Sequence, residues 1–395
     1  MRISTALSYD RSMSYLQKTN TKLDTVSEQY NTGLKFKTAA QDPTGMGNKL
    51  RFDAEISTYT QYSVNAGLAS DALGLEETAL SIIYETLSSC VVSLQSAVNG
   101  TFDKYNLDAV ATSLEESLAL VFDLTNTKTA EGEYIFSGSQ SMQPTMVKVA
   151  DGSYQCQADA GFRQVKVSPS VKVTTSDSGL GIFQQSQICR TASSNDASIS
   201  YSVSTQFDSF VNNIYVAGGN NDLTMNIDNA TGTYQIMHGT DVLQKGSYKE
   251  GDTIGFEGLE ITPNAGTISC TISLDEPKND NMLNTLSQMI TALRNEDLSK
   301  KELTTILQQG QVALNNSKEN VNVALGHVGG RLNNIEKVIN SNEALNVIKQ
   351  EARANITEVD AYEATSELVK QQNALQVAQR TFSMVNGSTL FDYIN

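Results

Sequence analysis

The sequence predicts a multidomain α+β protein, in which long N- and C-terminal helices form a coiled coil and a helical bundle rod, with an inserted antiparallel β-rich domain. Proline is absent between Pro43 and Pro144 and again after Pro277, so long helices are permitted on both sides of the middle segment. Half of the 26 glycines lie in residues 145–276, which favours turns and strands there. Outside this segment, apolar residues recur every three or four positions, as in helices.

The length of 395 residues is enough to bury more than one hydrophobic core. We expect three domains, each built from the segments that share a residue pattern. The first comprises 1–42 plus 355–395, the second comprises 43–143 plus 280–354, and the third comprises 144–279.

One long helix is expected to fill most of 43–98. Asp42 can cap its start, Pro43 presets its first turn, and Asn99-Gly100 supplies a stop. At about 1.5 Å per residue this helix would be about 80 Å long, a length suited to a rod or a bundle. Its apolar stripe is Leu73, Leu80, Ile83, Leu87, Cys90, Leu94 and Ala97.

A second long helix is expected after Ser299 and Glu302, which form a capping box. Its apolar stripe consists of Leu325, Val328, Leu332, Ile335 and Ile339.

Both ends of the chain carry heptad patterns typical of coiled-coil seams. The N-terminal seam comprises Met13, Leu16, Leu23, Tyr30 and Leu34, with Asn20 and Ser27 at intervening positions. The C-terminal seam comprises Val347, Ala354, Ala361, Leu368, Leu375 and Phe382, and the last four are accompanied three positions further on by Ala364, Gln371, Ala378 and Val385. Neither helix can bury its apolar face alone. Periodicity leaves two alternatives open: each end packs onto its own domain, or the two ends pair with each other.

Alternating apolar residues predict strands in the middle segment. The apolar positions are Val165, Val167, Val171, Val173, Leu223, Met225, Ile227, Tyr234, Ile236, Ile268, Cys270, Ile272 and Leu274. A turn is expected at 228–232, and Cys270 is expected on an inner, packed face.

The charge balance argues against nucleic acid and anionic membranes as partners. With 44 acidic and 28 basic residues, the formal net charge is -16, which repels phosphate groups. We expect no cleaved signal of the general secretory type and no membrane span, because no apolar run is long enough.

No catalytic or metal-binding constellation is expected, and hence no cofactor and no enzyme activity. The chain lacks the GxxxxGK, HExxH and GxSxG motifs. His238 fits a turn and His327 a structural position, since no further ligand lies at metal spacing. The pairs Glu76-Glu77 and Glu115-Glu116 are interpreted as solvated charge on helices.

The four cysteines are expected to be inert thiols. They are Cys90, Cys156, Cys189 and Cys270, and they lie far apart in the chain without a CxxC pair.

The two ends contain a series of motifs in a characteristic order. The N-terminal ones are MRIST at 1–5, NTGL at 31–34 followed by Asp42-Pro43, QYSVN at 61–65 and YIFSG at 134–138. The C-terminal ones are GHVGGRLN at 326–333, EVDAYEA at 358–364, QQNALQ at 371–376 and STLFDYIN at 388–395. In these motifs the chain resembles the flagellin and hook-associated axial proteins of bacterial flagella, over 1–143 and 282–395. One departure is Gln41, which stands where that family usually has an acid.

The resemblance implies a structural subunit whose paired ends line the inner tube of the flagellum and whose β domain lies outside. It implies a place at the junction of hook and filament, next to hook-associated protein 1 and flagellin, in a ring of identical subunits. It also implies an export chaperone that holds the C-terminal helix, passage through the flagellar type III apparatus, and an extracellular location. The assembly interface would then consist of ten seam residues: Met13, Leu16, Leu23, Tyr30, Leu34, Ala361, Leu368, Leu375, Phe382 and Val385.

Two other functions remain as alternatives. Flagellin itself, the bulk filament subunit, shares the architecture of the ends, although the MRIST start and the LFDYIN finish argue against it. An adhesin or coiled-coil binding module would explain the helices and the β segment but not the motifs at both ends.

Overall fold

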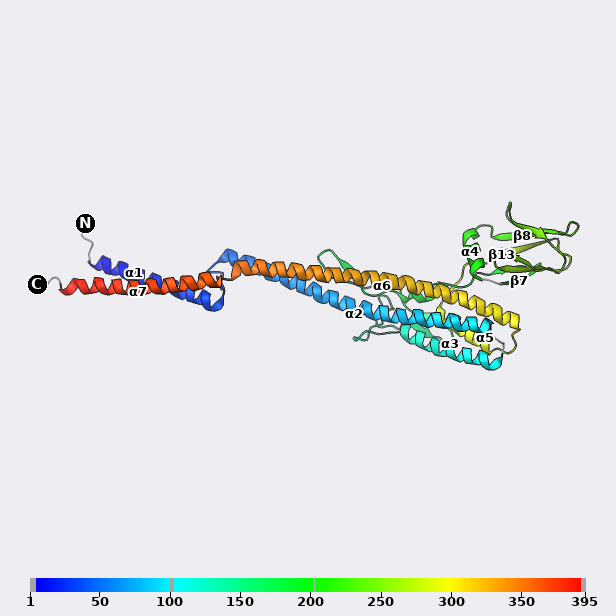
Figure 1. Cartoon of the computed structure of the whole chain (residues 1–395), viewed down its shortest axis with the longest axis horizontal. Helices are drawn as coiled ribbons and strands as arrows, with labels where there is room; N and C mark the ends of the chain where they lie inside the picture. Colours follow the sequence, from blue (N-terminus) through cyan, green and yellow to red (C-terminus); the bar gives the residue numbers. More distant parts are fainter. Residues whose placement is uncertain (1–4, 100–102, 202–203, 392–395) are drawn as a thin grey trace. The chain divides into compact units, whose positions relative to one another are not determined.

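The computed structural model describes residues 5–99, 103–201 and 204–391 (Figure 1). The helices are α1 (Thr5–Thr32), α2 (Pro43–Asn99), α3 (Lys104–Thr125), a short π-helix η1 (Leu180–Gln184), α4 (Ser204–Ile214), α5 (Met282–Arg294), α6 (Lys300–Thr357) and α7 (Ala361–Phe391). The predicted α+β class, with long terminal helices and an inserted antiparallel β region, is confirmed.

The chain divides into two compact units. The first comprises the chain up to Asn65 and from Lys337 onward, and the second runs from Ala66 to Glu336. The three-domain division with boundaries near 42, 144, 280 and 355 stays a prediction.

The long helix α2 occupies the predicted range, and its predicted stripe from Leu73 to Ala97 is buried throughout. Gly100, the expected stop, lies outside the described residues. The start of α6 also follows its prediction: the Ser299 amide donates to Glu302 Oε2 (2.9 Å), and the Glu302 amide donates to Ser299 Oγ (3.3 Å). On α6, Val328 and Ile335 of the predicted stripe are buried.

Helices α3 and α5 pack against each other through apolar faces. The buried side chains of α3 include Leu114, Leu118 and Val121, and those of α5 include Leu286 and Leu293. At the edge of this contact Arg294 Nη2 lies 2.9 Å from Glu115 Oε2.

The strands form small antiparallel sheets in the middle of the sequence. Three two-stranded ribbons are β1 (Met146–Lys148) with β2 (Tyr154–Cys156), β3 (Gln164–Lys166) with β4 (Lys172–Thr174), and β5 (Ser186–Gln187) with β14 (Asn279–Asp280). A five-stranded sheet has the order β10 (Asp241–Ser247), β9 (Thr233–His238), β8 (Asp222–Asp228), β13 (Ser269–Leu274) and β6 (Ala192–Ser193). A three-stranded sheet has the order β11 (Ile254–Phe256), β12 (Leu259–Pro263) and β7 (Ala197–Tyr201).

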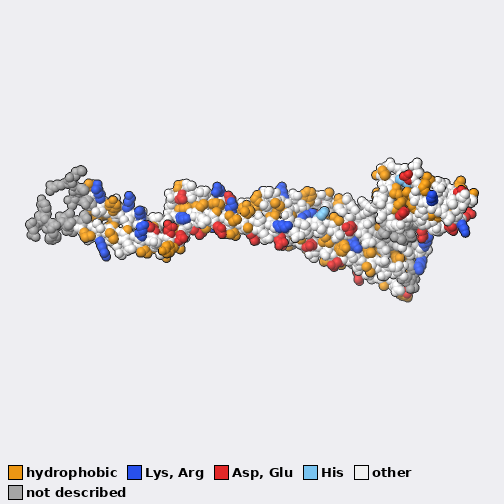
Figure 2. Space-filling model, turned by 45° about the horizontal axis from the view of Figure 1, so that its top comes forward, with side chains coloured by type: hydrophobic (Ala, Val, Ile, Leu, Met, Phe, Trp, Pro, Cys, Tyr) orange, Lys and Arg blue, Asp and Glu red, His pale blue; other side chains and the backbone are white. Residues whose placement is uncertain are grey.

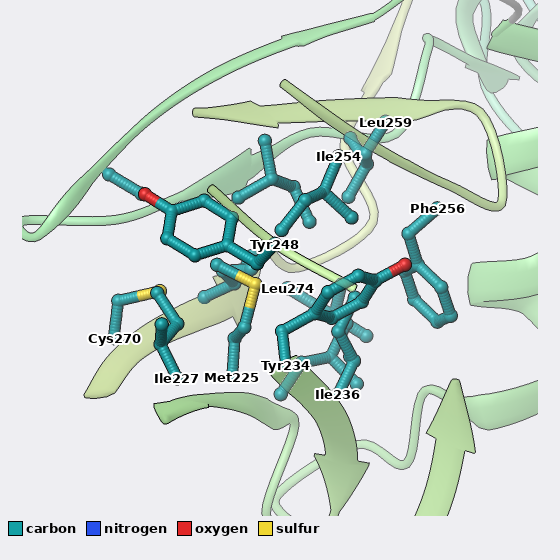
Figure 3. Close-up of a cluster of buried hydrophobic side chains, with 14 of the residues drawn as sticks. Met225, Ile227, Tyr234, Ile236, Tyr248, Ile254, Phe256, Leu259, Cys270 and Leu274 are labelled. Atoms are coloured by element: carbon teal, nitrogen blue, oxygen red, sulfur yellow. The ribbon is translucent and has the colours of Figure 1, made fainter. Parts of the chain in front are cut away.

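The two larger sheets and α4 share one hydrophobic core (Figure 3). Met225 and Ile236 from the five-stranded sheet, Ile254 and Leu259 from the three-stranded sheet, and Phe207 from α4 are all buried in it. Because both sheets and α4 bury their apolar side chains in this shared core, neither sheet has to be stable on its own.

Most predicted strand positions are buried as expected, including Cys270 on the inner face of β13. Asp228 Oδ1 accepts the amides of Ala230 (2.9 Å) and Thr231 (3.2 Å), which confirms the turn at 228–232. The prediction for Ile268 was wrong, because this side chain is 70% exposed and precedes β13. The turn in which Thr267 N donates to Asn264 O (3.1 Å) interrupts the alternation there.

Candidate functional site

The candidate site is the pair of terminal helices, α1 and α7, which pack against each other in antiparallel directions (Figure 1). The rings of Tyr9, near the start of α1, and Phe382, near the end of α7, lie 5.4 Å apart between centroids. Of the two arrangements that periodicity left open, the structure therefore shows the one in which the ends pair with each other.

The contact between the two helices is only partly buried. On α1, Met13, Leu16 and Leu23 are half-buried, and on α7, Leu368 and Leu375 are half-buried. A groove of about 440 Å³ lies along the contact, lined mainly by polar side chains such as Lys18, Thr21, Lys22, Glu367 and Gln371. The helix pair thus covers its apolar side chains less completely than a domain core does.

The other predicted interface residues differ in how far their side chains are exposed. Leu34 and Phe382 are half-buried, whereas Tyr30 is 49% exposed and Ala361 is exposed. The side chain of Val385 lies outside the described residues.

Two contact positions are absent from the predicted interface set. Ala364 is buried on α7, and Val26 is half-buried on α1. Ala364 belongs to the predicted seam, four residues before Leu368, but it was left out of the predicted interface residues. Val26 lies three residues after Leu23, a helical spacing that places both on one face.

A short backbone ladder closes the base of the helix pair. The Lys35 amide donates to Thr357 O (2.7 Å), and the Val359 amide donates to Gly33 O (2.9 Å). Lys35 Nζ adds a bond to Asn355 O at 2.7 Å. Gly33 has φ +70, a backbone conformation that glycine adopts without steric cost. The segment that connects α1 to α2 is therefore hydrogen-bonded to the segment that connects α6 to α7.

The start of α2 is shaped around Phe36. Asp42 Oδ1 accepts the amide of Gly45 at 2.8 Å, as the predicted N-cap requires. The buried Phe36 ring lies against Gly45, where a Cβ atom would come within 2.6 Å of the ring.

Ion pairs link the first turns of α2 to the last turns of α6. Arg353 Nη1 lies 3.1 Å from Asp53 Oδ1, and Lys349 Nζ lies 2.7 Å from Glu55 Oε2. The hydrogen bond from Lys49 is the main reason that the pKa of Asp53 lies below its usual value, and the bond from Arg353 adds to it.

Several large apolar side chains of the first unit are exposed. On the terminal helices they include Tyr15 (70%), Val377 (62%) and Met384, and on α2 and α6 they include Leu50 and Ile348. Figure 2 shows apolar side chains spread along the visible face of the helices, between acidic and basic ones. A helix face with this many exposed apolar residues is typical of a surface that another chain covers.

The two histidines lie on different elements, His238 on β9 and His327 on α6. His238 Nε2 lies 3.0 Å from Asn220 O beside the turn at Gly239, as predicted, and His327 is exposed on α6. Among the described residues, no three His, Cys, Asp or Glu side chains are placed to hold a metal ion. None of the described helices combines the length and the apolar character that crossing a membrane requires.

All four cysteines are described, and each is a free thiol. Burial raises the pKa of Cys189 to about 12 and that of Cys270 to about 11, so both thiols stay protonated at neutral pH.

The prediction that Glu76 is solvated was wrong, because its side chain is fully buried. The loop at Asp177 and the helix α6 at Arg331 cover this face of α2, and both are remote from Glu76 in the sequence. The neighbouring Glu77 and the pair Glu115-Glu116 are exposed, as predicted.

The known proteins to which this chain is similar include flagellar proteins. Residues 3–141 match the family model described as the bacterial flagellin N-terminal helical region. Flagellar hook-associated protein 3 of Salmonella typhimurium (strain LT2) is 22% identical over 396 residues, which cover 99% of each chain.

Solved structures show the same fold. Flagellar hook-associated protein-3 from Legionella pneumophila superposes with a TM-score of 0.60 at 23% identity, covering 77% of this chain and 98% of that one. FlgL from Xanthomonas campestris superposes with a TM-score of 0.58 at 19% identity, covering 77% and 99%. This chain therefore has the fold of FlgL proteins and is similar along its full length to a flagellar hook-associated protein 3.

Proposed function

We propose that this chain is a structural axial protein of the bacterial flagellum that forms the junction between hook and filament and templates flagellin polymerisation. The full-length similarity to a flagellar hook-associated protein 3 supports a role in the axial structure. The role is structural rather than catalytic, and it needs no cofactor.

The observation that carries the proposal is the incomplete burial of the terminal helix pair. Leu375 is half-buried and Val377 is 62% exposed on the same helix, so the pair offers apolar surface after α1 and α7 have met. In this proposal neighbouring subunits cover that surface, and the predicted interface residues Met13, Leu16, Leu23, Tyr30, Leu34, Ala361, Leu368, Leu375, Phe382 and Val385 belong to the assembly interface. Burial of apolar side chains supplies the driving force.

The proposal assigns a place to each predicted domain. Residues 1–42 with 355–395 form the inner tube, 43–143 with 280–354 form the rod, and 144–279 form the outer β domain. The partners are hook-associated protein 1 on one side, flagellin on the other, and identical subunits in a ring. Before export through the flagellar type III apparatus, a chaperone holds the C-terminal helix; afterwards the protein is extracellular.

Flagellin itself is the second candidate, because residues 3–141 match the flagellin N-terminal helical region. A deletion strain separates the two functions. Loss of a junction protein leaves hooks in place and releases unassembled flagellin into the medium, since the filament has nothing to grow on. Normal filaments in the deletion strain would contradict the junction role, and a medium without flagellin would favour the flagellin alternative. A strain that expresses the chain from a plasmid is the control.

A further inference from the structure

Glu76 is an acid enclosed by an apolar helix face. The side chains one turn before and one turn after it on α2, Leu73 and Leu80, are fully buried, and so is Glu76. Both Glu76 carboxyl oxygens are buried, and the backbone and side chain of Asp177 are the polar groups that act on them. An ionised carboxylate in such a place costs far more free energy than a neutral acid does.

Two charged side chains from other elements, Asp177 and Arg331, act on the Glu76 carboxyl group through their charges. Arg331 on α6 pairs with Asp177 in the loop between β4 and η1, with Arg331 Nη2 2.8 Å from Asp177 Oδ1. Both members of this ion pair are mostly buried, and Arg331 Nη1 is buried without a hydrogen-bond partner among the described residues. The site formed by Glu76, Asp177 and Arg331 therefore contains two carboxyl groups and one positively charged guanidinium group.

The Asp177 loop also holds two other loops together. Ser178 Oγ donates to the Asp159 carbonyl oxygen, and the Gly179 amide donates to Phe136 O at 2.7 Å. Next to this contact, the Phe136 and Phe183 rings meet at 4.9 Å between centroids. The bond between Asp177 and Arg331 is therefore one of the contacts that attach these loops to α6, beside the bond from Asn320 Nδ2 to Gln185 O.

We propose that Glu76, Asp177 and Arg331 form a proton-dependent latch, in which a proton on Glu76 keeps Asp177 on Arg331 and so keeps the loop at 176–179 attached to the long helices. When the proton leaves to solvent, two carboxylates compete for one guanidinium group. The bond from Arg331 to Asp177 weakens, and the loop detaches more often.

The electrostatic surroundings set the pH range of this latch. Burial and, to a smaller extent, the charge of Asp177 together raise the pKa of Glu76 to about 8, against the charge of Arg331, which lowers it. Glu77, beside it on α2, points to solvent, and His327 on α6 shares a surface hollow with Asp177. The proton is therefore held through neutral pH and released in mildly alkaline solution.

The sign of the effect on stability follows from proton linkage. The unfolded chain loses this proton near the ordinary value of 4.5, whereas the folded chain retains it up to about pH 8. Between these values the folded state binds one more proton, so stability falls as pH rises. The unfolding constant should increase by up to about tenfold per pH unit in this window and level off above it.

The test compares the full chain with Glu76→Gln, which keeps the shape but cannot ionise, and with Glu77→Gln, an exposed control with the same change in charge. Urea unfolding is followed by helical circular dichroism from pH 5 to pH 9. Glu76→Gln should lose the fall in stability between pH 5 and pH 8, whereas Glu77→Gln should keep it. Parallel pH profiles for wild type and Glu76→Gln would overturn the proposal.

Hydrogen exchange measures the latch itself. After correction for the intrinsic effect of pH, exchange at 176–179 should accelerate above pH 8 in the wild type and stay constant in Glu76→Gln. Asp177→Asn removes the neighbouring negative charge and should move the fall in stability to lower pH. If Glu76→Gln does not fold, this second variant decides, and an unchanged pH profile for it would contradict the latch.

Discussion

Gly45 lies directly against the Phe36 ring at the start of α2, where only a residue without a side chain fits. A Cβ atom at this position would lie 2.6 Å from the ring and 2.2 Å from Asp42 Oδ2, the carboxylate that caps the helix. Gly47, two residues further along the same helix, has open space around it. These two glycines allow the effect of the contact to be separated from the effect of helix propensity.

We predict that Gly45→Ala lowers the free energy of unfolding of the first unit by about 1–3 kcal/mol, as overpacking does in a well-filled site. Gly47→Ala should instead raise it by about 0.5–1 kcal/mol, because alanine favours the helix more than glycine does. Urea unfolding of both variants measures the difference. An equal gain in stability for the two would show that Phe36 does not depend on Gly45.

Single residues also show which features of the structure a sequence pattern can predict and which it cannot. The cap at Asp42 and the capping box at Ser299 were predicted, because their partners lie within three residues in the chain. The burial of Glu76 was missed, because it depends on Asp177 and Arg331, which the fold brings close from distant segments. Periodicity reports the face on which a residue lies, and it does not report what later covers that face.

At the scale of elements, α7 presents two kinds of apolar residue. Leu375 is half-buried, whereas Val377, two residues later, is 62% exposed. The heptad pattern predicted the position of Leu375, but it left open whether α7 packs on α1 or on another helix. The antiparallel pairing that brings Tyr9 to Phe382 depends on tertiary contacts rather than on either helix alone.

We predict that substitutions at these two positions change different properties: one lowers the stability of the free protein, and the other reduces incorporation into flagella. Leu375→Ala should lower the stability of the free protein by about 1–2 kcal/mol, less than for a fully buried leucine. Val377→Ser should leave the free protein within about 0.5 kcal/mol of wild type, as expected for an exposed site, but should reduce incorporation into flagella.

Circular dichroism of the purified protein measures the first quantity, and immunoblots of sheared flagella measure the second. The matched control is Gln376→Ser, since Gln376 is an exposed polar neighbour on the same helix. If Val377→Ser were incorporated as well as this control, the exposed face of α7 would have no part in assembly.

At the scale of the whole molecule, the sequence separated helical ends from a β-rich middle correctly because proline and glycine are distributed so unevenly. The strands at 223–227 and 270–274 could be predicted because alternation follows from a sheet with one buried face. The order β10-β9-β8-β13-β6 could not, because β6 joins the edge of the sheet from a distant part of the chain. Non-local pairing of this kind leaves no periodic signal in either strand.

If the proposed junction role is right, this chain lies at one level of the flagellum rather than along the filament. The turn after β8 offers a site for a label, because residues 229–231 are exposed and lie outside the shared core of the β region. An epitope tag inserted there allows the protein to be located by immunogold electron microscopy of intact flagella. The control is that the tagged strain swims normally. We predict gold in a single band at the boundary of hook and filament. Gold distributed along the filament would contradict the junction role and identify a bulk filament subunit instead.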